Sequence, residues 1–203
     1  MTMLSQQSID WWFSPWSYAL SAADLLPHTT DILGQRDGYR MWCDKAGVAA
    51  DLPRVGDPRW EAAFTVSGEE LMSTARLFRG LMLAREHNYE RLAGLSFADR
   101  KWCCSVASTQ PLRPVWQDGT GPEEAIDAEG LLDIALRLQH GFPGAWSRLR
   151  LTLSPDVAET VDALMHGIHE DRESLDASVA RAQRCWRICR ARAMEGGGQV
   201  QTN

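Results

Sequence analysis

Histidine and cysteine side chains in the last third of the chain are the first candidates for chemistry. His166 and His169 stand at i and i+3, so both imidazoles share one face if the segment is helical. Cys185 and Cys189 stand at i and i+4 and would also share a helix face. A structural zinc ion needs four such ligands, and the two pairs meet only if the last two helices pack antiparallel. The alternative is surface histidines with small buried thiols, and we therefore predict no metal site.

Other residue patterns give less support for catalysis. Cys103 and Cys104 are adjacent, which is a poor arrangement for a disulfide or a metal site. Residues 118–121 form a glycine-rich turn, but no strand or helix start frames it as a phosphate-binding loop requires. No nucleophile elbow, Walker loop, dinucleotide-binding motif or HExxH motif occurs. We predict that the chain is not an enzyme and binds no cofactor.

Composition places the chain among ordinary globular proteins. It has 203 residues, of which 44% are hydrophobic and 24% charged, and this fits one domain. The net charge of −6 argues against general binding of nucleic acid. Five cysteines without framework spacing favour a reducing cytosol. We see no signal peptide and no apolar run that could span a membrane, so we expect a cytoplasmic protein without direct membrane insertion.

The segment 129–155 is expected to form the core. Its first half has the period of a helix, with Arg137 and Gln139 on the solvent side. Its second half alternates leucine with polar residues, which predicts a short extended or β ribbon at 149–153. The residues that we expect to be buried are Leu131, Ile134, Ala135, Leu138, Trp146, Leu149, Leu151 and Leu153.

Start and stop signals predict helices along most of the chain. Ser67 and Glu70 fit a capping box, and Ser154-Pro155 fits a helix start with proline in its first turn. The expected helices cover residues 15–26, 67–95, 96–105, a segment that begins at 154, and 174–194. The predicted fold class is therefore mainly α: one globular helical domain over 9–194, preceded by a flexible segment 1–8 and followed by a disordered tail 195–203.

Two groups of side chains are candidate protein-binding residues. The first is the aromatic cluster of Trp11, Trp12 and Trp16, which forms either part of the core or a partly exposed anchor for a partner. The second is a row of basic residues on the last helix: Arg181, Arg184, Arg187 and Arg190. This row is a solvated helix face, a docking surface for an acidic protein, or a contact for nucleic acid or a membrane surface.

Three segments together resemble a known family. They are residues 13–18 (FSPWSY), residues 77–92 (LFRGLMLAREHNYERL), and Gly130-Leu131 leading into residues 145–155 (AWSRLRLTLSP). In this order, and in a chain of this length, they resemble the SctK (YscK/PscK-like) family of bacterial type III secretion systems. The similarity covers about a third of the chain, and the Trp-x-x-Arg-Leu-x-Leu-x-Leu pattern is its most specific part.

The resemblance implies a non-enzymatic role in protein transport and virulence. Members of that family are cytosolic adaptors of the injectisome's sorting platform, at the base of the secretion apparatus beneath the inner membrane. They link the cytoplasmic domain of the inner-membrane ring protein SctD to the pod protein SctQ, and indirectly to the stalk protein SctL and the export ATPase. The alternative is a helical chaperone or regulator of a secretion system that binds one partner. Genome neighbourhood and a pull-down would separate the two.

Overall fold

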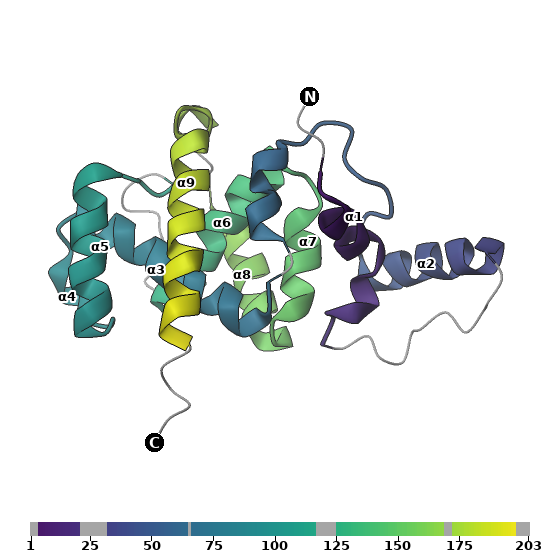
Figure 1. Cartoon of the computed structure of the whole chain (residues 1–203), viewed down its shortest axis with the longest axis horizontal. Coiled ribbons are helices and arrows are strands. Elements are labelled where there is room, and N and C mark those ends of the chain that lie inside the picture. The colour runs from purple at the N-terminus through teal and green to yellow at the C-terminus, as the bar shows by residue number, and fades with distance from the viewer. Residues whose placement is uncertain (1–3, 21–31, 65, 117–124, 169–171, 198–203) are drawn as a thin grey trace, which may run out of the picture.

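The computed structural model describes residues 4–20, 32–64, 66–116, 125–168 and 172–197, and it is mainly helical (Figure 1). These residues contain no strand. The elements are α1 (Gln6–Phe13), η1 (Pro15–Ser17), α2 (Ile32–Ala46), η3 (Pro58–Ala63), α3 (Gly68–Arg85), α4 (Tyr89–Leu92), α5 (Phe97–Thr109), α6 (Ile126–Gly141), α7 (Ala145–Leu149), η4 (Arg150–Thr152), α8 (Pro155–Gly167) and α9 (Arg172–Gly197).

Helix α6 is the centre of the fold. Every residue from Glu129 to Leu138 is buried, and α6 packs most extensively against α3. The two helices approach closely at Gly130, where a Cβ atom would lie 2.6 Å from the carbonyl carbon of Ala75. Glycine is therefore required at this crossing. The predicted burial of Leu131, together with the other apolar positions of its helix, is confirmed.

The structure corrects the prediction for Arg137, which is buried rather than on the solvent side. Its guanidinium forms an ion pair with Asp133 one turn earlier and donates hydrogen bonds to Ser178 Oγ and to the carbonyl of Arg113. The other oxygen of Asp133 accepts the backbone N–H of Val115 at 3.0 Å. A buried ion pair is tolerated when its remaining donors and acceptors are satisfied in this way. Gln139 is exposed, as expected.

The prediction of an extended ribbon at residues 149–153 is wrong. Residues up to Leu149 belong to α7, and η4 follows it. Alternation failed because Arg148 is fully buried, while Leu151 leaves the main core and packs in a second cluster. Leu149 and Leu153 are both buried and stand at i and i+4, which suits a helical turn as well as a strand.

Helix boundaries follow the predicted capping signals at several places. Ser67 Oγ accepts the N–H of Glu70 at 3.2 Å, and Ser96 Oγ accepts the N–H of Asp99 at 3.1 Å. The long helix ends at Arg85 and not at residue 95. Of the helix predicted over 15–26, the described residues 15–20 contain only the 3-10 helix Pro15–Ser17. Residues 21–26 of that prediction lie outside the described part. Helix α1 starts at Gln6, before the predicted domain boundary at residue 9.

Helix α2 extends away from the other helices at one end of the molecule, opposite α4 and α5 (Figure 1). Its C-terminal half holds it in place, because Trp42 and Cys43 are buried in the second cluster. Tyr39 adds a hydrogen bond from its hydroxyl to the carbonyl of Ala50 at 2.6 Å. Leu33 and Met41 on the same helix are exposed.

Candidate functional site

Helix α9 carries three of the four candidate arginine residues, Arg181, Arg184 and Arg187, on a face that remains open to solvent. Its other face is apolar and buried against the core, through Leu175, Ala182, Cys185, Trp186 and Cys189. This division explains the local structure, because an amphipathic helix buries its apolar stripe and leaves the charged side outside. Arg184 and Arg187 are exposed at the middle of the open face.

The arginine residues of α9 differ in their bonding. Arg190 is bound to Glu70 at 2.6 Å and donates to the carbonyl of Ala62 at 2.9 Å, so it fastens α9 to the body. Arg181 donates to the carbonyl of Pro111 at 3.1 Å. Within the described part of the chain, Arg184 and Arg187 have neither a hydrogen bond nor an ion pair. We call Arg181, Arg184 and Arg187 the arginine ridge.

The predicted aromatic cluster lies mostly inside the protein. Trp11 stacks on Phe64 and on Tyr18 with ring centroids 4.9 and 5.0 Å apart. Trp12 is 1% exposed and receives the guanidinium of Arg148 over its ring at 4.1 Å. Trp11 and Trp12 are therefore core residues in this fold. Partner binding by these residues stays a prediction.

Trp16 is half-buried, between Tyr39 and Trp42. Other large apolar side chains of α1 and α2 are exposed. They are Phe13 on α1 and Leu33 and Met41 on α2, with exposed fractions of 39%, 67% and 62%. We call these three residues the α1–α2 apolar end. Phe13 lies beside α2, because its ring centroid is 5.6 Å from that of Tyr39. Exposed apolar side chains are typical of a site where another protein binds when they form one contiguous patch.

Of the four residues considered as zinc ligands, the structure describes three, and their surroundings differ. Cys185 and Cys189 are buried in the core, and burial raises the pKa of both thiols. His166 donates from Nδ1 to the carbonyl of Asp162 at 2.6 Å, and His169 lies outside the described residues. No group of three or more histidine, cysteine, aspartate or glutamate side chains that could hold a metal ion occurs among the residues described.

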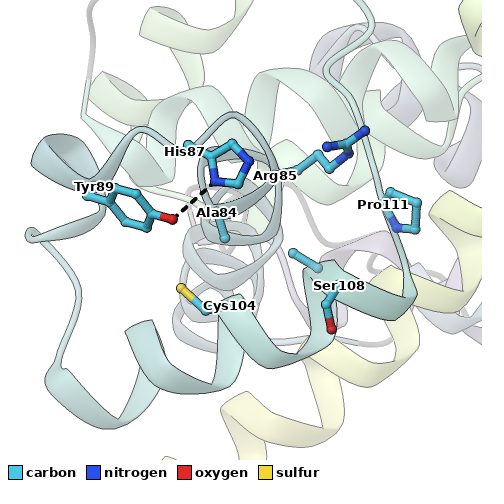
Figure 2. A pocket seen from close by; sticks show the side chains of 8 residues that line it. Ala84, Arg85, His87, Tyr89, Cys104, Ser108 and Pro111 are labelled. Atoms are coloured by element: carbon cyan, nitrogen blue, oxygen red, sulfur yellow. Dashed lines mark hydrogen bonds between the residues drawn. The ribbon is translucent and has the colours of Figure 1, made fainter.

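A pocket that the sequence did not predict lies between the end of α3, α4 and the C-terminal half of α5 (Figure 2). Its volume is about 310 Å³. The residues that line it are Ala84, Arg85, His87, Tyr89, Cys104, Ala107, Ser108 and Pro111. Arg85, His87, Tyr89 and Cys104 are all exposed. No carboxylate lines this pocket, although the protein as a whole is acidic.

The position of His87 results from the way α3 ends. The N–H of Asn88 bonds to the carbonyl of Leu83 at 2.9 Å and the N–H of His87 to that of Ala84 at 3.4 Å, which is a Schellman motif. His87 has a φ of 57°, a conformation usually occupied by glycine at this position. Its Nδ1 lies 3.1 Å from the hydroxyl of Tyr89, and this hydrogen bond orients the imidazole at the pocket (Figure 2).

Sequence reasoning missed the pocket because its residues come from three separate helices, α3, α4 and α5. Residues 85–89 fall inside the helix that the sequence predicts over 67–95, so the turn that exposes them was not expected. The available signal was Asn88, which caps α4 by accepting the N–H of Arg91 at 3.2 Å. Asparagine is among the preferred N-cap residues, and it marked a new helix start.

Comparisons with known proteins add no relatives. No family model, curated protein or solved structure matches the chain. None of the helices in the described residues is both long enough and apolar enough to span a membrane. The function is therefore inferred from the arginine ridge, the α1–α2 apolar end and the pocket, and from the resemblance of the three sequence segments.

Proposed function

We propose that the chain is a non-enzymatic adaptor in the cytoplasmic sorting platform of a type III secretion system. The proposal joins the SctK-like segments with a helical fold that offers two different surfaces. The arginine ridge and the α1–α2 apolar end lie on different helices, α9 and α1–α2, which Figure 1 shows apart. An adaptor between a ring protein and a pod protein needs two such separate contacts.

The observation that carries the proposal is the open charge of Arg184 and Arg187. Arg190 is bound to Glu70 of its own chain, whereas no carboxylate of the described residues forms an ion pair with Arg184 or Arg187. Both residues are exposed on a protein of net charge −6. Such a local positive surface steers an acidic partner and sets its orientation, and its effect falls as salt rises.

The three segments that resemble the SctK family contribute mainly to the core of the fold and not to a binding surface. Phe78, Leu81 and Trp146 of these segments are buried in the main core. We infer that the shared pattern specifies a common helical framework, and that the contacts with SctD-like and SctQ-like partners are made by surface residues around it.

A pull-down from native cells tests the proposal. We expect the chain to recover both an SctQ-like pod protein and an SctD-like ring protein, with SctL and the export ATPase following indirectly. Recovery of neither partner would refute the adaptor role. Recovery of a single exported protein would favour the chaperone or regulator instead.

A charge reversal, Arg184→Glu with Arg187→Glu, tests the ridge in the same experiment. It should abolish one of the two interactions and spare the other. The matched control is Arg54→Glu with Lys101→Glu, which makes the same change in net charge at exposed residues outside both surfaces and should spare both interactions. Circular dichroism should show an unchanged helix content for both variants.

A further inference from the structure

The pocket of Figure 2 has the chemistry of an anion site. The guanidinium of Arg85 has neither an ion pair nor a hydrogen bond within the described part of the chain. The neighbouring carboxylate of Glu86 is bound to Arg79 at 3.1 Å and does not neutralise it. His87 and Tyr89 are bonded to each other through Nδ1 and the hydroxyl, and the N–H or O–H that this bond leaves free can donate to a ligand. Ala84 and Ala107 add apolar side chains to the lining.

The pocket is also connected to the arginine ridge. Pro111 lines the pocket, and its carbonyl accepts the hydrogen bond from Arg181 at 3.1 Å. Arg181 stands one helical turn before Arg184, so positive groups continue from α9 to the pocket. A peptide that is bound along the ridge can therefore reach the pocket, and no carboxylate lines that pocket.

We propose that this pocket receives a glutamate or aspartate side chain from an acidic peptide segment of the partner that docks on the arginine ridge. The proposal rests on the proposed function for the identity of that partner, and on the pocket itself for the chemistry. Arg85 forms the charge-assisted contact, because a guanidinium binds a carboxylate with two parallel hydrogen bonds. His87 adds a further donor, and the bond to Tyr89 fixes its orientation.

The left-handed conformation of His87 fits this role. A glycine would complete the same helix end without strain, yet the chain has an imidazole there, at the edge of the pocket. His87→Gly should therefore keep the fold while removing a binding group. This separates the pocket's role in binding from its role in the structure.

The rate at which Cys104 is alkylated measures directly whether the pocket is occupied, because Cys104 lines the pocket. It is exposed, whereas Cys43, Cys103, Cys185 and Cys189 are buried. Iodoacetamide should therefore modify the native protein at Cys104, and a ligand in the pocket should slow that reaction. Cys104→Ser is the control for the assignment of the modified site.

The test uses the full chain at low salt with a short fluorescein-labelled peptide that alternates glutamate and alanine. A peptide with glutamine in place of glutamate is its neutral control. We expect the glutamate peptide to bind and to slow alkylation of Cys104, and Arg85→Glu to weaken both effects about tenfold or more. His87→Gly should weaken them less. Arg54→Glu, an equal charge change on the loop before η3, should leave both unchanged.

Two results would overturn the inference. One is binding of the glutamate peptide with no change in the alkylation of Cys104, which would place the contact on the ridge alone. The other is equal binding by the wild type, Arg85→Glu and His87→Gly, or no binding at all.

The native pull-down distinguishes failure of this inference from failure of the adaptor role. If both partners are recovered but Arg85→Glu changes neither them nor the peptide, the pocket assignment fails and the adaptor role stands. If the peptide behaves as expected and no platform protein is recovered, the pocket assignment stands and the adaptor role fails.

Discussion

Replacing Gly130 with alanine should destabilise the protein, although alanine normally favours a helix. The added methyl group would lie 2.6 Å from the carbonyl carbon of Ala75, whereas ordinary carbon contacts are about 3.5 Å. Helices α3 and α6 would have to separate by about 1 Å at their closest approach. Because the obstacle is backbone, overpacking should cost about 3 kcal/mol, and the better helix propensity of alanine returns about 1 kcal/mol.

The expected net loss is about 2 kcal/mol, or about 4–8 °C in Tm for a chain of this size. Urea unfolding followed by tryptophan fluorescence measures it, because tryptophans such as Trp60 and Trp186 are buried in the core. Gly167→Ala is the matched control, since a Cβ there meets nothing within 4 Å, and it should be neutral or slightly stabilising. If Gly130→Ala were as stable as Gly167→Ala, the tight α3–α6 crossing would be wrong.

Three further changes test other parts of the structure. Trp146→Ala removes a buried ring and its hydrogen bond to Asp162 (3.1 Å), and should cost about 3–5 kcal/mol; an unchanged Tm would refute the role of Trp146 in the core. Burial raises the pKa of Glu61, but hydrogen bonds from Ser5 and Ser8 outweigh it and hold that pKa below its ordinary value of 4.5. The ionised Glu61 therefore stabilises the fold above pH 4.5, and this stabilisation is lost as the pH falls through the lowered pKa. The urea midpoint of the wild type should then fall more steeply below about pH 4.5 than the midpoint of Glu61→Gln. Parallel curves of urea midpoint against pH for the two proteins would contradict this. His87→Gly should raise the free energy of unfolding by up to about 1 kcal/mol because it relieves the left-handed backbone; a clear loss of stability would show that the imidazole is needed for the fold.

Apolar periodicity was sufficient to predict the helical fold, because burial of a stripe depends on local spacing alone. Leu131, Ile134 and Leu138 follow that rule in α6. The rule failed at Arg148, which a local pattern assigns to solvent. Its burial depends on Trp12 and on the carbonyl of Ala49, which are distant in the sequence. No spacing rule reports partners of that kind.

The candidate site could be predicted only in part. Amphipathicity placed Arg184 and Arg187 outward, since the opposite face of α9 is apolar. Arg190 has the same residue type and a similar position, but Glu70 and the carbonyl of Ala62 hold it to the body. The pocket was not predictable, because it depends on a helix end with histidine where glycine is usual. It also depends on α5 packing beside that turn.

The affinity of purified SctQ-like and SctD-like proteins for the chain, measured against salt concentration, tests the central claim most directly. For the partner that binds the arginine ridge, the wild type should bind more weakly as salt rises. Arg184→Glu with Arg187→Glu should lower its affinity at low salt about tenfold or more. The affinity of the second partner for the ridge variant should be unchanged, and so should the affinities of both partners for the Arg54→Glu, Lys101→Glu control. Equal affinities of both partners for the wild type and the ridge variant, at every salt concentration, would contradict the account.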